Sequence, residues 1–396
     1  MDRLRIVTFT TLFPNPVQPT HGLFVAQRLR HLLADEPDLQ ARVVAPVPWF
    51  PWSRSCFGRY AAYARVPRHE NPDGLPVWHP RYPVIPRVGM SLVPLTLALA
   101  ALPVLRALRR DGFPMRLIDA HYYYPDGVAA ALLGQWLGIP VVITGRGTDL
   151  NLIPRHWLPR AWIRWAAGRA AASVTVCAAL REVLLDLGLP PGKVTVLRNG
   201  VDAGLFRPVD RLVARAALGM TRPTLLAVGH LIPRKGHDRI IRALPELPGV
   251  DLCIVGEGPE RATLEDLARG LGVAARVRMP GTVPQPELPR YYGAADGLVL
   301  ASTREGWANV LLEAMACGTP VVATPAWGTP EVVAAPEAGL LADGFEPAQI
   351  ARACRALLAA PPRREATRAY AERFSWRETS RGQRELFRQV LAAREG

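Results

Sequence analysis

Lysine and cysteine are both scarce in this chain of 396 residues. Of 48 basic residues only two are lysine, Lys193 and Lys235, and all the others are arginine. The five cysteines are scattered, odd in number and without metal-ligand spacing, which excludes a zinc site or a disulfide framework built from them. They are typical of small core residues in a reducing compartment.

Long uninterrupted hydrophobic runs are also missing. The first nine residues are too briefly apolar for a signal peptide and predict a first β-strand instead. Between Val88 and Leu108 the chain is largely apolar, but Pro94, Pro103 and Arg106 interrupt it, and its unbroken stretches are shorter than the ~20 residues of a membrane span. We expect a buried or surface-lying helix there, and a cytoplasmic protein. Peripheral attachment to the inner membrane face stays open.

Positive charge is unevenly distributed. The net charge is +14, and residues 1–200 hold 23 basic and 12 acidic residues, a difference of +11. An excess of this kind favours contact with phosphate groups, an anionic membrane or nucleic acid, or else it is a solvated surface without a specific partner. The sequence has no recognisable nucleic-acid-binding module, so we expect no nucleic-acid partner.

Short apolar runs alternate with longer helical segments, and the series occurs twice. Continuous apolar strands separated by helices predict parallel sheets covered on both faces, here two doubly wound α/β domains. The expected domains are 1–200 and 201–375, followed by a helix over 376–396 that packs back on the first domain. Residues 50–86 fit neither period and predict an irregular insertion. The expected strands are Arg5–Thr10, Ala41–Pro46, Leu117–His121, Val141–Thr144, Ser173–Val176, Lys193–Leu197, Thr224–Val228, Asp251–Val255, Arg276–Met279, Gly297–Leu300 and Val321–Thr324.

One motif, at residues 298–324, carries most of the functional information. It reads LVLASTREGWANVLLEAMACGTPVVAT, in which a strand is followed by Glu305 at an expected helix start and by Glu313 eight residues later. Two carboxylates so spaced can face one crevice at different depths and accept hydrogen bonds from sugar or ribose hydroxyls. Free N–H groups at residues 306–309 would meet a phosphate or sugar oxygen. The alternative is a capped surface helix with two solvated glutamates.

A second candidate site follows the first strand of the second domain. The segment reads VGHLIPRKG over residues 228–236, with adjacent Arg234 and Lys235 in a loop bounded by glycines. Two cations at the carboxyl end of a strand can neutralise a diphosphate. The alternative is an ordinary basic surface loop.

At these residues the chain resembles the retaining glycosyltransferases of family 4, which have the GT-B architecture of two Rossmann-like domains facing a central cleft. The resemblance extends to the NGVD at 199–202 and the VGEGP at 255–259, and it covers most of residues 195–380. In the first domain it is thinner, resting on the loop 13–27, on the HYYYPDG at 121–127 and on residues 145–151.

The resemblance implies a role for each matching residue. Arg234 and Lys235 would neutralise the diphosphate, Glu305 would hold the donor sugar and Glu313 the ribose. Gly22 would let the first domain approach the phosphates, and the backbone near Val283 would contact the base. Residues expected in catalysis are Arg234, Lys235, Glu305 and His121. Those expected to bind the donor are Gly22, Gly229, His230, Arg234, Lys235, Val283, Glu305, Gly306, Trp307, Ala308, Asn309, Val310 and Glu313.

Two positions depart from the family pattern. His230 stands where many members have arginine, so that phosphate neutralisation would depend more on Arg234 and Lys235. Arg146 stands where many members have histidine, and because arginine does not lose its proton it cannot be a general base. We expect Arg146, with Asp149, on the acceptor side, where the arginine would bind an anionic group. His121 is either the proton acceptor of this domain or a core histidine.

The resulting expectation is a retaining glycosyltransferase that uses a UDP- or GDP-linked sugar. Its acceptor would be a glycan or a lipid-linked molecule, as in cell-envelope or exopolysaccharide synthesis. No Asp-x-Asp element follows a strand, so we expect neither a metal nor another cofactor. The alternatives are a sugar-nucleotide epimerase or hydrolase of the same fold and a catalytically silent scaffold. A dinucleotide-dependent oxidoreductase is disfavoured because, in the G-x-G-x-x-G-like run at 256–261, Arg261 occupies the third glycine position and Pro259 breaks the loop pattern.

Overall fold

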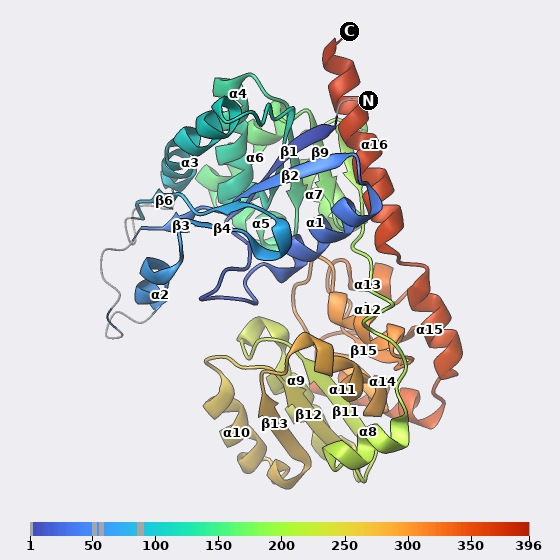
Figure 1. Cartoon of the computed structure of the whole chain (residues 1–396). Coiled ribbons are helices and arrows are strands. Elements are labelled where there is room, and N and C mark those ends of the chain that lie inside the picture. The colour runs from blue at the N-terminus through green and yellow to red at the C-terminus, as the bar shows by residue number, and fades with distance from the viewer. Residues whose placement is uncertain (1–2, 50–53, 55–58, 85–90, 396) are drawn as a thin grey trace. The chain divides into compact units, whose positions relative to one another are not determined.

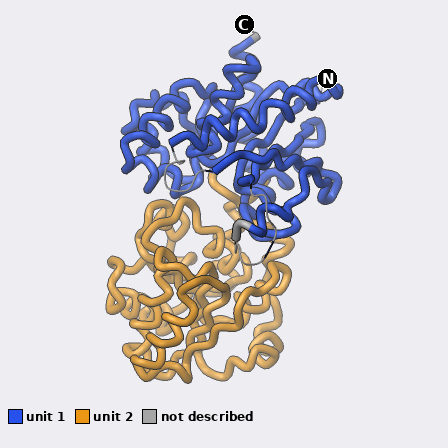
Figure 2. The backbone as a smooth tube through the Cα atoms, turned by 90° about the vertical axis from the view of Figure 1, so that its left-hand side faces the viewer, with its two compact units in different colours: residues 1–197, 377–396 blue, residues 198–376 orange. Residues whose placement is uncertain are grey.

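The computed structural model describes residues 3–49, 54, 59–84 and 91–395. Its internal contacts divide the chain into two compact units, shown in Figure 2. Unit 1 comprises Met1–Leu197 and Arg377–Gly396, and unit 2 comprises Arg198–Trp376. Both are α/β structures with a central sheet (Figure 1), and each is described by itself below.

Unit 1 is built on an eight-stranded sheet in the order β10-β9-β8-β7-β1-β2-β5-β4. All neighbours are parallel except β4 and β5. The strands are β1 (Leu4–Phe9), β2 (Leu39–Val44), β4 (His69–Glu70), β5 (Val77–Trp78), β7 (Leu117–His121), β8 (Val141–Gly145), β9 (Ala172–Thr175) and β10 (Val194–Val196). A separate parallel pair is formed by β3 (Val47–Pro48) and β6 (Arg81–Tyr82).

Helices pack on this sheet and enclose its core. They are α1 (Leu23–Asp35), α3 (Val93–Arg110), α4 (Val128–Leu137), α5 (Thr148–Asn151), α6 (Trp157–Arg169), α7 (Ala178–Asp186) and α16 (Trp376–Glu395), with the short α2 (Arg59–Arg65). Strand residues such as Ile6 and Val43 form one apolar cluster with Leu29 of α1. Phe387 of α16 is fully buried in the same cluster. The C-terminal helix is therefore part of the core of unit 1.

Unit 2 has a six-stranded parallel sheet in the order β13-β12-β11-β14-β15-β16. Its strands are β11 (Thr224–Val228), β12 (Asp251–Val255), β13 (Val277–Gly281), β14 (Gly297–Leu300), β15 (Val321–Ala323) and β16 (Gly339–Leu341). Its helices are α8 (Arg211–Leu218), α9 (His237–Ala243), α10 (Arg261–Gly270), α11 (Leu288–Ala294), α12 (Asn309–Ala316), α13 (Thr329–Val332), α14 (Pro347–Ala359) and α15 (Arg364–Glu372). A buried cluster of aliphatic side chains from β11, β12, α9 and α14 forms its core.

The doubly wound class predicted from the sequence is confirmed, and each expected strand overlaps an observed one. The expected irregular insertion at 50–86 is partly wrong, because β5 extends the main sheet beside β2 and β6 pairs with β3. Those strands have two residues each, too short to give a readable pattern. Four of the cysteines, Cys177, Cys253, Cys317 and Cys354, are free and buried, whereas Cys56 lies outside the described residues.

The expected helix near 88–108 is α3, which begins at Val93; residues 85–90 lie outside the described part of the chain. One face of α3 is buried, through Leu97, Ala101 and Leu105. Leu95 and Leu99 lie on the opposite face and are exposed. Among the described residues, no helix is long and apolar enough to cross a membrane.

Candidate functional site

Each sheet has one point at which the order of its strands reverses direction. In unit 2 the chain proceeds from β11 through β12 to β13 on one side, and from β14 through β15 to β16 on the other. In doubly wound folds ligands bind beyond the carboxyl ends of the strands at such a switch point. The segments that leave β11 and β14 are 229–236 and 301–308, and these are the two segments that the sequence motifs singled out.

Glu305, Lys235 and Arg234 form one charged cluster at this point. The Lys235 ammonium donates to Glu305 Oε1 at 2.7 Å, and an Arg234 guanidinium nitrogen lies 3.6 Å from the same oxygen. Burial raises the pKa of Glu305, but the charges of Lys235 and Arg234 outweigh it, so the pKa lies below the usual value. Glu305 is therefore ionised at neutral pH although it is buried. Arg234 also donates to the Arg304 carbonyl at 2.8 Å, which joins the two loops.

Free N–H groups lie directly after Glu305. Helix α12 begins at Asn309, and the Asn309 N–H donates to the Trp307 carbonyl. The N–H groups of Gly306, Trp307, Ala308 and Val310 have no acceptor among the described residues. Unpaired N–H groups at the positive end of a helix attract anions and oxygen acceptors. The segment therefore offers donors beside a buried carboxylate and two cations.

Glu313 lies about one turn into α12 and contacts a tyrosine of another helix. The Tyr292 hydroxyl, from α11, donates to Glu313 Oε2 at 2.7 Å. Burial raises the pKa of Glu313 to about 7, and the hydrogen bond from Tyr292 acts in the opposite direction. The two glutamates of the motif therefore differ in charge behaviour, because only Glu305 has cations beside it.

The remaining donor-site candidates of unit 2 lie on loops at the same sheet edge. Gly229 follows β11 with a φ of 152°, and the carbonyl of Gly229 lies 2.0 Å from where a Cβ on Gly256 would stand. His230 is exposed, and its ring is 3.3 Å from the Glu257 carbonyl. Val283 follows β13 and is half-buried. Glycines are thus required here by the close approach of two loops.

In unit 1 the strand order reverses between β1 and β7. Gly22 ends the loop after β1, with a φ of 66°, and a Cβ there would lie 2.2 Å from the Leu12 carbonyl. The loop itself therefore requires glycine, apart from any ligand. Asp126, which follows β7, accepts hydrogen bonds from the N–H and the hydroxyl of Thr11 and ties the two loops together.

His121 and Arg146 are brought together at the ends of β7 and β8. One Arg146 guanidinium nitrogen donates to His121 Nδ1 at 2.8 Å, and His121 Nε2 lies 3.2 Å from Asp119 Oδ2. Burial lowers the pKa of His121 to about 4, against the opposing charge of Asp119. The ring is therefore neutral, with both nitrogens engaged. Its part as a proton acceptor stays a prediction, one that this geometry does not favour.

Asp149 organises the backbone around Arg146. Its carboxylate accepts from the N–H groups of Tyr123 at 2.8 Å, Arg146 at 3.0 Å and Gly147 at 2.7 Å. Burial raises the pKa of Asp149, and these N–H groups lower it. The turn that presents Arg146 is thus fixed by a buried carboxylate, and the side chain of Asp149 has three partners within its own unit.

Tyr292 and Asp126 were not among the residues singled out from the sequence. Both lie where the family resemblance holds, within 195–380 and 121–127, but nothing in the sequence there shows that their side chains contact Glu313 or Thr11. These contacts depend on how α11 packs on α12 and on how the loop after β1 meets β7.

Comparison with known proteins gives the family of the chain. Residues 210–374 match the family model for glycosyl transferases group 1, and residues 60–205 match that for glycosyltransferase family 4. A D-inositol 3-phosphate glycosyltransferase of Thermobispora bispora is 37% identical over 305 residues, 69% of this chain and 71% of that protein. A GDP-mannose-dependent alpha-(1-6)-phosphatidylinositol monomannoside mannosyltransferase of Mycolicibacterium smegmatis is 38% identical over 309 residues, 72% of this chain and 73% of that protein.

Another D-inositol 3-phosphate glycosyltransferase, from Segniliparus rotundus, is 39% identical over 215 residues, so that the match spans 51% of this chain and about half, 48%, of that relative. Among solved structures, sucrose-phosphate synthase from Thermosynechococcus elongatus has a TM-score of 0.81 at 22% identity, covering 99% of this chain and 100% of that one. HepE of Anabaena in complex with UDP has a TM-score of 0.73 at 21% identity, with 98% and 100% covered. The fold is therefore GT-B, and the chain belongs to the group 1, family 4 glycosyltransferases.

Proposed function

We propose that this glycosyltransferase transfers a sugar, with retention of configuration, from a nucleoside diphosphate sugar to a glycan or lipid-linked acceptor. The observation that carries the proposal is the cluster at the switch point of unit 2. There the cations Arg234 and Lys235 lie beside the buried, ionised Glu305, and unpaired N–H groups follow Glu305 directly. Such a set fits a ligand that carries both hydroxyl groups and a diphosphate.

The cations act on the leaving group. Negative charge develops on the bridging oxygen as the bond to the sugar breaks, and preorganised positive charge is the largest stabilising contribution available. Arg234 and Lys235 supply that charge, and the N–H groups at 306–310 add dipoles. In the structure the Lys235 ammonium donates a hydrogen bond to Glu305 Oε1, at 2.7 Å. A diphosphate would share the ammonium with this carboxylate.

The two glutamates would hold hydroxyl groups. Glu305 would accept from the donor sugar, and Glu313 would accept from the ribose, as the family resemblance implies. Among the described residues no three His, Cys, Asp or Glu side chains gather in a way that could hold a metal ion. We propose transfer without a metal, in which Arg234 and Lys235 neutralise the diphosphate.

The acceptor is proposed to carry an anionic group. Two relatives are named for inositol 3-phosphate and for a phosphatidylinositol monomannoside, and the first half of the chain carries the charge excess of +11. Arg146, presented by the turn that Asp149 fixes, is the proposed anion-binding side chain. A cell-envelope acceptor would fit this chemistry.

The donor proposal is tested by thermal unfolding in the presence of UDP, GDP or ADP and their sugar conjugates. A nucleotide present at 100 times its dissociation constant should add about 2.7 kcal/mol of apparent stability. We expect one nucleoside diphosphate to raise the unfolding temperature of the wild type, and Glu313→Ala to abolish the rise, because the ribose loses its acceptor. Glu331→Ala, a substitution of the same kind at a surface ion pair with Arg198, should leave the rise intact.

The donor identified in this way then serves in the transfer assay. NMR of the product should show the same anomeric configuration as the donor sugar. Inversion would contradict retention, a rise with NAD(P) alone would contradict the donor proposal, and conversion of the donor without any acceptor would favour an epimerase or hydrolase.

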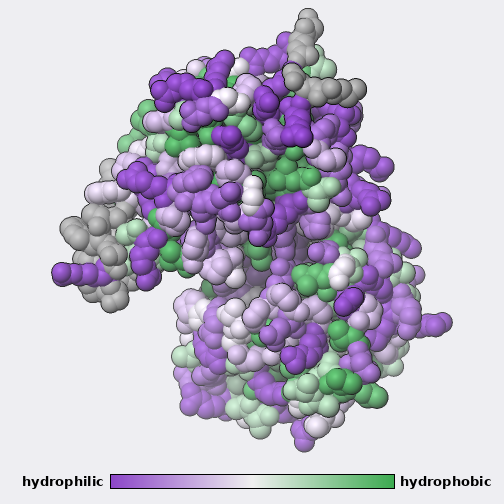
Figure 3. All heavy atoms as spheres, viewed as in Figure 1, coloured by the Kyte–Doolittle hydropathy of each residue, from purple (hydrophilic) through white to green (hydrophobic). Residues whose placement is uncertain are grey.

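Peripheral membrane contact is proposed through α3. Leu95 and Leu99 are exposed on this helix, and Arg106, Arg109 and Arg110 are exposed near its end. Hydrophobic side chains also lie among hydrophilic ones at the surface in the region of α3 and α4 (Figure 3). An apolar stripe beside arginines fits a helix that lies on an anionic bilayer surface.

Flotation with phosphatidylglycerol vesicles tests this surface. The wild type should float with the vesicles at low salt and much less at high salt, because the attraction is screened. Leu95→Ser with Leu99→Ser should lower the bound fraction at least threefold. Leu212→Ser, which changes an exposed leucine of unit 2, is the matched control. No flotation of the wild type at low salt would contradict the proposal.

A further inference from the structure

The Glu313 carboxylate contacts one further side chain, that of Tyr292 on α11. We propose that Tyr292 is a positioning residue of the donor site: its hydroxyl fixes one carboxylate oxygen of Glu313 so that the other oxygen faces the ribose. The inference rests on the proposed function, in which Glu313 accepts hydrogen bonds from the nucleotide. It adds to that function a residue that acts through Glu313 and touches no substrate.

The hydrogen bond itself is well placed for this role. The hydroxyl of Tyr292 donates to Glu313 Oε2 at 2.7 Å, and Tyr292 is fully buried. Burial, together with the adjacent carboxylate, raises the pKa of Tyr292 well above its ordinary value, so the phenol always carries its proton. Glu313 Oε1 has no partner among the described residues. One oxygen is thus committed and the other is available.

Tyr292 is held at its ring and at its main chain. Its ring meets Phe206 edge-on, with centroids 6.0 Å apart. Its carbonyl accepts from Thr319 Oγ1 at 2.6 Å, and Arg364 donates to the same Thr319 oxygen at 2.6 Å. The side chain therefore has little freedom to turn away from Glu313.

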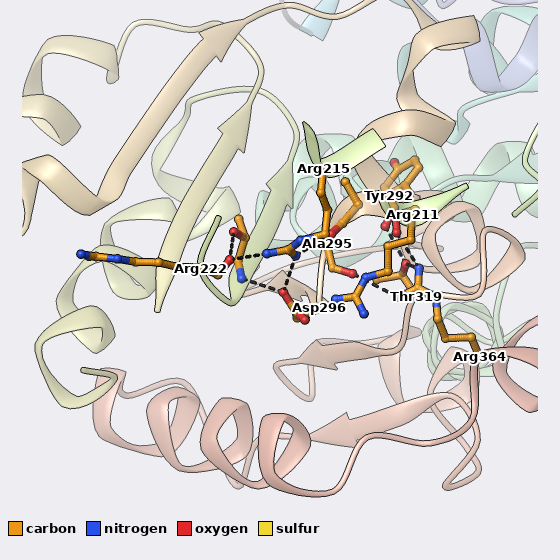
Figure 4. Close-up of polar contacts among 11 residues, drawn as sticks. Arg211, Arg215, Arg222, Tyr292, Ala295, Asp296, Thr319 and Arg364 are labelled. Carbon is orange, nitrogen blue, oxygen red and sulfur yellow. Dashed lines mark hydrogen bonds and ion pairs between the residues drawn. The ribbon is translucent and has the colours of Figure 1, made fainter. Parts of the chain in front are cut away.

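The end of α11 is capped residue by residue. After Tyr292, the carbonyl of Gly293 accepts from Arg364 at 2.9 Å, that of Ala294 from Arg215 at 3.0 Å and that of Ala295 from Arg364 at 3.2 Å. Figure 4 shows Arg211 and Arg215 converging on Asp296 and Arg364 reaching Thr319. The carbonyls of four successive residues, 292–295, thus accept hydrogen bonds from side chains, three of them from arginine, and that of Tyr292 also accepts from the Ala295 N–H. These hydrogen bonds fix the end of α11 at Tyr292 and at the three residues that follow it.

Among the described residues, Tyr292 is the one hydrogen-bond donor to Glu313, and the neighbouring charged groups bind elsewhere. The sulfur of Cys317 lies one turn farther along α12, and burial raises its pKa to about 12. From α15, Arg364 turns toward Thr319 and backbone carbonyls. Arg368 turns toward the Ala316 carbonyl and Glu372. The protonation of Glu313 is therefore set by burial and by Tyr292.

Tyr292→Phe removes the hydroxyl and little else. At pH 7 it should weaken binding of the nucleotide, measured by isothermal titration calorimetry with UDP, GDP and ADP, by about tenfold, the effect of one hydrogen bond to a charged group. Because the lost hydrogen bond opposes protonation, the acid limb of the affinity profile should move to higher pH. The loss of nucleotide affinity should therefore be smaller at pH 9, where the Glu313 carboxylate is ionised in the wild type and in the variant.

Three companion variants make this result specific. Tyr291→Phe removes the hydroxyl of the adjacent tyrosine and should leave affinity and its pH profile unchanged. Glu313→Gln cannot ionise, so its profile reports only the titration of the nucleotide's own phosphates. In the double variant Tyr292→Phe with Glu313→Gln, the effects should not add, because the first acts through the second.

A purely structural role would give a different outcome. An acid limb that does not move, or additive losses in the double variant, would overturn the inference. Should Tyr292→Phe fail to fold, wild-type protein made with 3-fluorotyrosine serves instead. Its more acidic phenol donates more strongly and should shift the acid limb to lower pH, and an unmoved limb would overturn the inference.

Failure of the proposed function would look different again. If 2′-deoxy and 3′-deoxy nucleotides bind the wild type as tightly as the ribonucleotides do, Glu313 does not hold the ribose and the donor assignment fails. If the wild type discriminates against them while Tyr292→Phe behaves as wild type throughout, the donor assignment stands and only the role of Tyr292 fails.

Discussion

Lys235→Met is expected to lower kcat for sugar transfer by about 10²- to 10³-fold, the usual loss when one preorganised charge at a developing oxyanion is removed. Methionine keeps the length of the side chain and removes its charge. Glu305 then loses the ammonium 2.7 Å away and retains only Arg234, at 3.6 Å. The change thus acts on the leaving group and on the ionisation of the sugar-binding carboxylate at once. Initial rates at saturating donor measure it.

The second lysine of the chain is the matched control. Lys193 lies in unit 1, and its ammonium makes only long contacts, of 3.4 and 3.5 Å, with backbone carbonyls. Lys193→Met should leave kcat within about twofold, as surface substitutions away from a site usually do. If Lys235→Met retained more than a third of the wild-type kcat, the diphosphate would not depend on this cation, and the mechanism proposed above would be wrong.

Arg28→Ala is expected to lower the free energy of unfolding of unit 1 by about 3–5 kcal/mol, because each of two buried acceptors left unsatisfied costs about 1–3 kcal/mol and the attraction to Asp119 is lost as well. Arg28 is 1% exposed, and it donates from Nε to Gln383 at 2.8 Å and to the Leu197 carbonyl at 3.1 Å. Burial lowers its pKa to about 10, against the attraction of Asp119, so it is charged at pH 7. Alanine would leave the Gln383 amide oxygen and the Leu197 carbonyl without this donor, and it would remove the positive charge that attracts Asp119.

Urea unfolding followed by tryptophan fluorescence and by far-UV circular dichroism measures the change. Arg30→Ala is the control from the same helix, because Arg30 pairs with Asp73 at 2.8 Å where both side chains are largely exposed. An exposed pair of this kind contributes at most about 1 kcal/mol. Similar losses for Arg28→Ala and Arg30→Ala would show that the buried network does not stabilise the unit.

The sequence was sufficient where one local pattern decides the structure. Strands such as β7, β8, β11 and β14 were predictable because they are buried on both faces and read as continuous apolar runs. The placement of Arg234, Lys235 and Glu305 was predictable because loops at the ends of neighbouring parallel strands carry them. Glu313 follows on helix α12, which begins after one of these loops. The three-residue β16 was missed because only its first residue, Gly339, is buried, so it forms no continuous apolar run of the kind that revealed β15.

Contacts between distant segments could not be predicted. Gln383 donates to Asp119 across 264 residues of sequence, and Asp119 in turn faces His121. A histidine at the end of a strand can either have a nitrogen free to accept a proton or have both ring nitrogens hydrogen-bonded. For His121 the packing of α16 and the turn at Arg146 decide between these two states. The same holds for the hydroxyl of Tyr292, whose partner depends on how α11 packs on α12.

The composition of unit 1 from two separate stretches of chain has a consequence for synthesis on the ribosome. Phe387 and Gln383 reach their places only after residues 198–376 have been translated. Until then the apolar side chains of unit 1 that pack against α16 stay exposed, and Arg28 lacks one of its hydrogen-bond partners, Gln383. Domains fold as units during translation. Unit 2, although it is translated second, is therefore the first part of this chain that can complete its core.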